Sequence, residues 1–133
     1  KIRREGKDIS VITWGPKMMD LATKAAEILA PEGIDLAIID LRTLWPWDRE
    51  TVLNSVKKTG RALILHEDSK VLGFGAEISA TISEEMTFYS LKARVRRLAA
   101  LNTPIPGNRE LEDARLPQMQ DMLRSCRELM EES

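Results

Sequence analysis

The sequence predicts a single α/β domain in which helices cover both faces of a mostly parallel β-sheet, a three-layer α/β/α sandwich. Short apolar runs typical of buried strands alternate with longer segments in which apolar residues recur at helical spacing. Gly33 and Gly60 follow the first two helical segments, where a glycine commonly ends a helix. With 133 residues, the chain is large enough to bury a substantial core. We expect residues 1–133 to form one domain, and because the first residue is Lys1 we expect a fragment of a longer polypeptide or a trimmed product.

The composition excludes several classes of protein. The formal net charge is −1, so no overall field attracts nucleic acid or a membrane surface. No apolar run approaches the roughly 18 residues that span a bilayer, and no signal-like segment opens the chain. The single cysteine, Cys126, excludes an internal disulfide and fits a reducing compartment.

The amino-terminal third predicts strand, strand and helix. Residues 1–4 form a short charged strand, and residues 9–14 form the first buried strand. Gly15 lets the chain turn, and Pro16 occupies the first helical position, where proline is well tolerated. The apolar positions of this helix are Met18, Leu21, Ala22, Ala25, Ile28 and Leu29.

The next segment predicts a second βα unit. Residues 36–39 form an apolar strand, and Asp48 caps the helix that follows. Trp47, just before this cap, can pack on Val52 as a hydrophobic staple. Gly60 ends the helix.

The stretch from Arg61 to Met86 predicts strand, polar loop and helix. Ala62 to Leu65 form a buried strand, which His66, Glu67 and Asp68 end with three polar side chains. A helix then begins near Phe74, and its apolar stripe is Phe74, Ile78, Ile82 and Met86.

The carboxyl-terminal part predicts a last strand at 94–99 and a final helix. Arg94, Arg96 and Arg97 suit an edge strand protected against mispairing, with a phosphate-binding patch as the alternative. From Pro117 onward an amphipathic helix carries one apolar side, formed by Leu116, Met119, Met122, Leu123, Cys126 and Met130. Cys126 on this stripe reads as a small buried hydrophobe rather than a nucleophile.

The arrangement of the strands predicts where polar groups meet. If strands 9–14 and 61–66 are neighbours, with 35–40 and 94–99 outside them, the strand order reverses between the central pair. Open α/β sheets place ligand sites at such a reversal. We therefore expect a switch-point cluster of Trp14, Gly15, His66, Glu67 and Asp68, with Trp14 and His66 within about 10 Å of each other.

Several chemistries are excluded by spacing. Gly73-Phe74-Gly75 begins like a dinucleotide fingerprint, but position 78 is Ile. A zinc site has no second histidine, since His66 is the only one in the chain. A G-x-S-x-G elbow is absent from the sequence. No catalytic residue is assigned: His66 is a weak candidate general base, and the competing interpretation places it in a hydrogen bond at the end of the sheet or at a subunit contact.

A set of segments resembles a known family. The chain resembles the C-terminal, transketolase-like domain of the E1 beta subunit of thiamine-diphosphate-dependent 2-oxo acid dehydrogenases. The matching segments are Val11-Ile12-Thr13-Trp14-Gly15, Ile39-Asp40-Leu41-Arg42-Thr43-Leu44, Pro46-Trp47-Asp48, Lys58-Thr59-Gly60-Arg61, His66-Glu67-Asp68, Gly73-Phe74-Gly75-Ala76-Glu77-Ile78, Asn102-Thr103-Pro104-Ile105-Pro106, Leu111-Glu112 and Leu116-Pro117. The Pro46-Trp47-Asp48 segment looks most like the branched-chain (2-oxoisovalerate) members, with pyruvate or acetoin dehydrogenase as alternatives.

The resemblance implies a five-stranded mixed sheet of order 1-3-2-4-5 with strand 1 antiparallel. It implies a parent enzyme that decarboxylates 2-oxo acids with thiamine diphosphate and Mg and passes the acyl group to lipoyl-E2. Because the sequence lacks Gly-Asp-Gly, with which the diphosphate-binding motif of the family begins, we expect this domain to bind no cofactor and to be inactive alone. The compartment implied is the bacterial cytoplasm or the mitochondrial matrix.

The resemblance also implies partners. These are the E1 alpha subunit, a second E1 beta subunit and the basic peripheral subunit-binding domain of E2, for which Glu128, Glu131 and Glu132 are the docking candidates. Asn102, Gly107 and Arg115 depart from the family pattern and affect any partner contact of their loop. A free-standing α/β module that binds small anions through Gly15 and residues 66–68 is the alternative of another class.

Overall fold

A computed structural model describes the chain except for residues 43–45, 70–73, 86–89, 101–116 and 133, and leaves the side chains of residues 68, 69 and 100 aside. The strands are β1 (Ile2–Arg4), β2 (Ile9–Thr13), β3 (Leu36–Asp40), β4 (Ala62–Ser69) and β5 (Arg96–Ala100). The helices are α1 (Pro16–Leu29), the 3-10 turn η1 (Ala30–Glu32), α2 (Arg49–Thr59), α3 (Phe74–Glu85) and α5 (Met119–Glu131).

The strands form one mixed sheet in the order β1-β3-β2-β4-β5. Only β1 runs antiparallel to its neighbour; the pairs β2–β3, β2–β4 and β4–β5 are parallel. The predicted strand order and the antiparallel first strand are therefore confirmed. Because β3 and β4 lie on either side of β2, the strand order reverses between β2 and β4.

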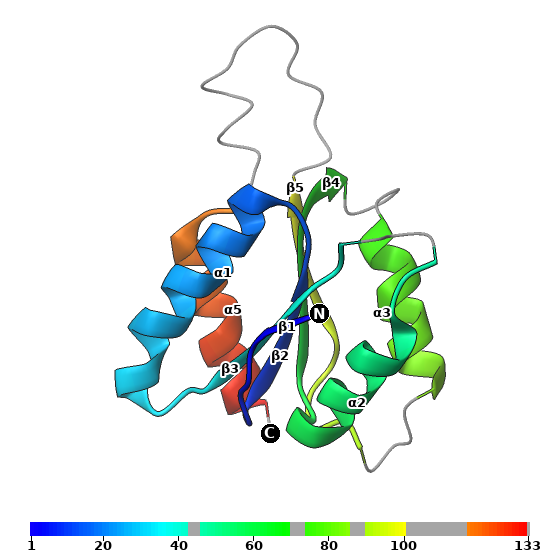
Figure 1. Ribbon diagram of the computed structural model, residues 1–133. Helices are drawn as coiled ribbons and strands as arrows, with labels where there is room; N and C mark the ends of the chain where they lie inside the picture. Colours follow the sequence, from blue (N-terminus) through cyan, green and yellow to red (C-terminus); the bar gives the residue numbers. More distant parts are fainter. Residues whose placement is uncertain (43–45, 70–73, 86–89, 101–116, 133) are drawn as a thin grey trace, which may run out of the picture.

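Two helical layers cover the sheet, as Figure 1 shows, with α1 and α5 on one face and α2 and α3 on the other. The first core cluster joins the buried sides of α1 and α5 to one face of the central strands, including Leu29, Leu63 and Met122. The second joins α2 and α3 to the opposite face, including Ile12, Val56 and Ile78. The three-layer α/β/α sandwich predicted from the sequence is confirmed.

Local signals in the sequence explain where α2 begins and ends. The Asp48 carboxylate accepts hydrogen bonds from the backbone N–H of Thr51 at 3.2 Å and from the Thr51 hydroxyl at 2.6 Å. Gly60 ends the helix in a left-handed conformation with φ of 76°, which favours glycine. Trp47 and Val52 are both buried in the cluster on this face, as a hydrophobic staple requires.

The structure corrects three boundaries or faces. β4 does not end at His66 but continues to Ser69, because Ser69 pairs with Ala100 after a shift in register. The last strand comprises residues 96–100 rather than 94–99. Ile28, expected on the apolar side of α1, is 43% exposed, and Ala26 is buried instead.

Parts of several sequence predictions fall outside the described residues. They are Met86 on the α3 stripe, Leu116 on the final helix, and the departures Asn102, Gly107 and Arg115.

Candidate functional site

Trp14 and His66 meet where the strand order reverses. Trp14 follows β2, His66 lies in β4, and their rings stack with centroids 5.1 Å apart and planes 9° from parallel. The hydroxyl of Thr13 donates a hydrogen bond of 2.7 Å to the carbonyl oxygen of Leu65, which ties the two strands together beside the stack. The predicted proximity of Trp14 and His66 is confirmed.

Phe74 and Trp47 extend this stack into an aromatic cluster. The ring of Phe74, at the start of α3, lies edge-on to Trp14 at 5.9 Å and to Trp47 at 6.1 Å. Gly75 packs against the imidazole of His66, because a Cβ placed there would lie 2.7 Å from His66 Cδ2. The glycine therefore lets α3 approach the buried histidine more closely than any other residue would.

Gly15 and Glu67 are neighbours at the edge of this cluster. Gly15 has a φ of 87° and precedes α1, and a Cβ placed on it would lie 3.9 Å from a carboxylate oxygen of Glu67. Glu67 is exposed. Because Gly15 directly precedes α1, the carboxylate of Glu67 lies close to the amino end of that helix, which carries a partial positive charge. The side chain of Asp68, the fifth predicted member, lies outside the described part of the chain.

The arrangement suits packing better than catalysis. His66 is completely buried, stacked on Trp14 and covered by Gly75, so its ring presents no surface to a substrate. Among the described residues, no three His, Cys, Asp or Glu side chains are placed to hold a metal ion. Cys126 is buried in the core, and burial raises the pKa of its thiol to about 12, which leaves it protonated at neutral pH.

The acidic end of α5 makes intramolecular ion pairs. Arg96 of β5 donates to Glu132 at 2.6 Å and to Glu128 at 3.2 Å, and Arg94 reaches Glu132 at 3.5 Å. The hydrogen bond from Arg96 lowers the pKa of the Glu132 carboxyl. Glu131, in contrast, is exposed and makes no ion pair with another described residue. Two of the three predicted docking residues thus hold α5 against the edge strand.

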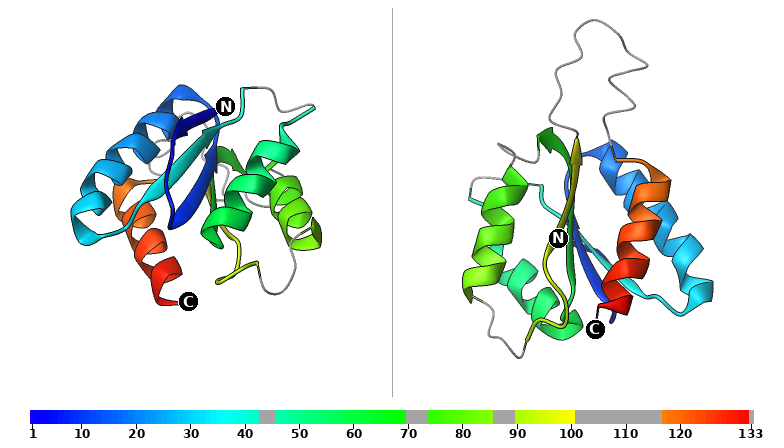
Figure 2. Two further views of the ribbon diagram at one scale, coloured as in Figure 1. Left: turned by 60° about the horizontal axis from the view of Figure 1, so that its bottom comes forward. Right: turned by 180° about the vertical axis from the view of Figure 1, so that it is seen from behind.

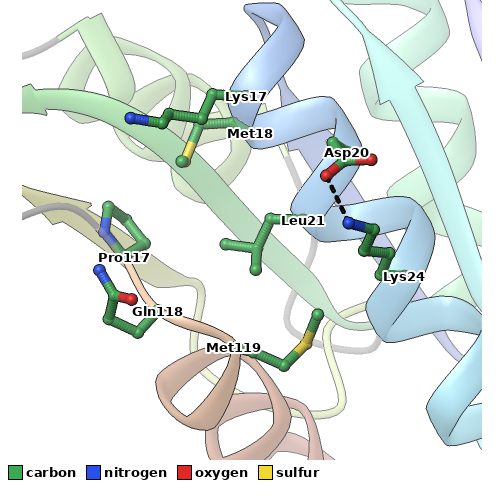
Figure 3. A pocket seen from close by; sticks show the side chains of 8 residues that line it. All are labelled: Lys17, Met18, Asp20, Leu21, Lys24, Pro117, Gln118 and Met119. Carbon is green, nitrogen blue, oxygen red and sulfur yellow. Dashed lines mark ion pairs between the residues drawn. The ribbon is translucent and has the colours of Figure 1, made fainter. Parts of the chain in front are cut away.

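A shallow hollow lies between the first turns of α1 and the start of α5, on the opposite face of the sheet from α2 and α3. It encloses about 420 Å³. Figure 3 shows Leu21 and Met119 approaching it from the two helices, and Asp20 paired with Lys24 at 3.0 Å at its rim. The polar groups here are exposed helix residues, so the hollow offers no assembled reactive centre.

Sequence reasoning missed part of the aromatic cluster. The sequence predicts only a helix stripe for Phe74, a glycine pair for Gly75 and a staple for Trp47. In the structure Phe74 packs on Trp14 and Trp47, and Gly75 packs on His66. The signal was present as Gly73-Phe74-Gly75, a short spacing that places an aromatic ring and a close backbone approach at one helix start.

None of the helices in the described ranges has both the length and the apolar character that crossing a membrane requires.

The sequence of the chain is similar to those of two known enzyme subunits. It is 48% identical over 106 residues to the beta subunit of mitochondrial 2-oxoisovalerate dehydrogenase from Dictyostelium discoideum, an alignment covering 80% of this chain and 28% of the relative. It is 43% identical over 127 residues to a mitochondrial pyruvate dehydrogenase E1 beta-1 subunit from Arabidopsis thaliana, covering 96% of this chain and 34% of the relative. The chain thus spans about a third of the length of these curated relatives.

The fold comparison agrees. A solved chain described as a split-gene transketolase, in an inactive beta4 tetramer, superimposes with a TM-score of 0.78 at 25% identity, covering 97% of this chain and 40% of that one. The family model for the transketolase C-terminal domain matches residues 1–122. The chain therefore belongs to the family of transketolase C-terminal domains.

Proposed function

We propose that this chain is the C-terminal domain of the E1 beta part of a 2-oxo acid dehydrogenase, where it supports assembly and partner docking. The observation that carries the proposal is the match of residues 1–122 to the transketolase C-terminal domain, together with relatives that are E1 beta subunits. The branched-chain type is our first choice, with pyruvate or acetoin dehydrogenase as the alternative, because the 2-oxoisovalerate relative has the higher identity over its shorter alignment.

The proposed role is structural rather than chemical. The parent enzyme would use thiamine diphosphate with Mg, which supplies the carbanion chemistry that decarboxylates a 2-oxo acid. The described residues do not fit thiamine diphosphate and Mg. The buried His66 is stacked in an aromatic cluster, and no three His, Cys, Asp or Glu side chains among the described residues are placed to hold a metal ion. We therefore assign no step of the reaction to this chain.

The competing module that binds small anions has weaker support. Its anion would lie at the amino end of α1, next to Gly15. The carboxylate of Glu67 is already close to that point and would repel a second negative charge. The geometry at the strand reversal thus favours a packing role over anion capture.

A chimaera tests the proposed role. Residues 1–133 replace the C-terminal domain of a 2-oxoisovalerate dehydrogenase beta subunit, which is then co-expressed with its alpha subunit. We expect assembled E1 that decarboxylates 2-oxoisovalerate and binds thiamine diphosphate at the sites that the rest of the complex supplies. A chimaera that folds, by circular dichroism, yet fails to assemble would contradict the proposal.

Titration of the 133-residue chain with thiamine diphosphate and Mg is the companion measurement. We expect no heat of binding in calorimetry. Tight binding by the chain alone would show that the domain has a cofactor role and would overturn the structural assignment.

The substrate is tested on the native assembly. The polypeptide that carries this domain, purified with its partners, is assayed with 2-oxoisovalerate, pyruvate and acetoin. We expect the highest kcat/KM with 2-oxoisovalerate; a preference for pyruvate or acetoin would select the alternative type and leave the domain assignment unchanged.

A further inference from the structure

The outer edge of β5 is open in the described part of the chain. β5 is the last strand of the sheet and pairs with β4 on one side only. The right-hand view of Figure 2 shows β5 facing the viewer between α3 and α5. A strand at the edge of a sheet presents a row of N–H and C=O groups to which another strand can bind.

A hollow of about 370 Å³ lies at the start of this edge. Ser79 of α3 and Ser125 of α5 both line it, together with residues 94–97. Because α3 and α5 cover opposite faces of the sheet, their side chains can line one hollow only beyond the last strand. The hollow is therefore a groove whose walls are α3 and α5 and whose floor is residues 94–97, which include the first two residues of β5.

The size and polarity of the groove suit a peptide backbone. A strand added to a sheet lies about 4.8 Å from its neighbour, and the small side chains of Ser79 and Ser125 leave room for it. The N–H and C=O groups along the edge can form hydrogen bonds with a peptide backbone, which carries both acceptors and donors. The carbonyl oxygens of the edge would repel a small anion, which offers only acceptors.

Arginines supply the charged side chains that line the groove. Arg94, Arg96 and Arg97 line it, and they are the only charged side chains among its described lining residues. Glu128 and Glu132 pair with Arg96 on the α5 side, and Glu132 also reaches Arg94 at 3.5 Å, but the side chain of Arg94 remains 85% exposed. Arg94 is therefore placed to meet a carboxylate on an incoming segment.

We propose that this groove binds an extended acidic segment of a partner protein, which adds a strand to the sheet beside β5. Backbone hydrogen bonds supply the affinity, and a carboxylate of the segment pairs with Arg94 to supply the selectivity. A second copy of the chain fits poorly, because its own β5 would bring arginines opposite arginines, and like charges facing each other destabilise strand pairing. The proposal is independent of which 2-oxo acid the parent enzyme uses.

Fluorescence polarisation of a labelled peptide tests the proposal. The probe is a synthetic peptide of about ten residues, the length of a long strand, in which Glu alternates with Val; the matched control alternates Lys with Val. We expect the 133-residue chain to bind the Glu peptide at least about tenfold more tightly than the Lys peptide at low salt.

Two N-methylated versions of the Glu peptide separate strand addition from charge attraction. One carries methyl groups on the odd-numbered amides and the other on the even-numbered amides, and only alternate amides of an added strand point toward the sheet. We expect one version to bind at least about tenfold more weakly and the other to bind like the parent peptide. Equal affinity of the two versions, or no binding of the parent peptide, would overturn the proposal.

Charge variants locate the site. Arg94→Gln should weaken peptide binding severalfold, whereas Arg124→Gln should leave it unchanged, because Arg124 is an exposed arginine of α5 that pairs with Asp121 instead. Circular dichroism confirms that both variants fold. Equal effects of the two variants, displacement of the peptide by inorganic phosphate beyond the effect of chloride at matched ionic strength, or dimers of the chain in sedimentation that exclude the peptide, would each contradict the proposal.

Discussion

At the scale of single residues, the contact between Gly75 and His66 decides how closely α3 packs on the sheet. A Cβ at position 75 would lie 2.7 Å from His66 Cδ2, closer than carbon atoms approach without a shift. We expect Gly75→Ala to lower the free energy of unfolding by about 1–3 kcal/mol, the usual cost of overpacking. Urea unfolding of the chain measures this loss.

A second variant assigns the loss to this contact. If the clash with His66 is the cause, His66→Ala should cost less in the Gly75→Ala background than in the parent chain. Equal costs in both backgrounds would place the strain of the alanine elsewhere.

His66→Ala alone tests the interpretation of the aromatic cluster. The change removes a fully buried ring that stacks on Trp14, so we expect the unfolding free energy to fall by about 2–4 kcal/mol. In assembled E1 we expect weaker assembly or acyl transfer, while decarboxylation persists in the complexes that form. Loss of decarboxylation in a variant that assembles and binds cofactor normally would instead assign His66 a catalytic role.

Of the contacts in the aromatic cluster, the sequence predicts the proximity of Trp14 and His66 but not the contacts of Phe74. The strand order alone predicts that Trp14 and His66 meet, since each follows the last residue pair, Thr13 and Leu65, of the adjacent parallel strands β2 and β4. The glycines around Phe74 indicate a close approach at the start of α3, but the contacts of Phe74 with Trp14 and Trp47 depend on the angle at which α3 packs, which that spacing does not encode. Pairwise packing between elements is therefore the part that sequence reasoning missed.

At the scale of elements, the sequence predicts a helix or strand boundary where neighbouring residues set it, and misses the boundary where a distant strand sets it. The ends of α2 were predictable because Asp48 and Gly60 act on their own helix. The true end of β4 was not, because pairing of Ser69 with Ala100 extends a strand through three polar residues. The partner strand, more than the polarity of the sequence, decides where an edge pair ends.

The cap of α2 gives a prediction at this scale. Asp48→Ala removes the acceptor for the Thr51 N–H and should cost about 0.5–2 kcal/mol of unfolding free energy. Asp48→Asn keeps a cap acceptor and should cost less. Chemical denaturation compares the two variants, and equal losses would show that charge, rather than capping, is what Asp48 contributes.

The ion pair between α5 and β5 predicts a pH dependence. The hydrogen bond from Arg96 lowers the pKa of Glu132 below its ordinary value of 4.5. A carboxyl with a lowered pKa in the folded state stabilises the fold fully above its unfolded pKa and loses that contribution as pH falls through the lowered folded value. Glu132→Gln should therefore reduce stability at neutral pH, by less than about 1 kcal/mol for so exposed a pair.

Urea unfolding at neutral pH and at steps below pH 4.5 checks this expectation. The difference between the parent chain and Glu132→Gln should shrink as the pH falls. Glu131→Gln is the matched control, since Glu131 makes no ion pair with a described residue and should change stability little at any pH. A difference that grows in acid would reverse the sign assigned to the pair.

At the scale of the whole molecule, the carboxylates at the acidic end of α5 differ in whether they are paired within the domain. Glu128 and Glu132 form ion pairs with Arg96 of β5, so their charges are largely compensated within the domain, whereas Glu131 is exposed to solvent. If this end of the domain helps to capture the basic binding domain of E2, the carboxylate that is free of internal pairs should contribute most. Exposed charges at the rim of an interface chiefly raise the association rate.

We therefore expect Glu131→Gln in the assembled E1 to slow association with the E2 binding domain at an ionic strength of about 0.01 M, and to have little effect at about 1 M, where such charges are screened. Glu132→Gln should slow association less than Glu131→Gln, because the Glu132 carboxylate is already paired with Arg96 and Arg94 and is less available to the partner. Glu128→Gln should likewise slow association less than Glu131→Gln, because Glu128 is paired with Arg96. Stopped-flow association rates at the two ionic strengths measure all three variants. Rates for Glu131→Gln equal to those of the parent at low salt would remove this residue from the docking surface and leave α5 as a helix whose acidic end serves only to hold β5.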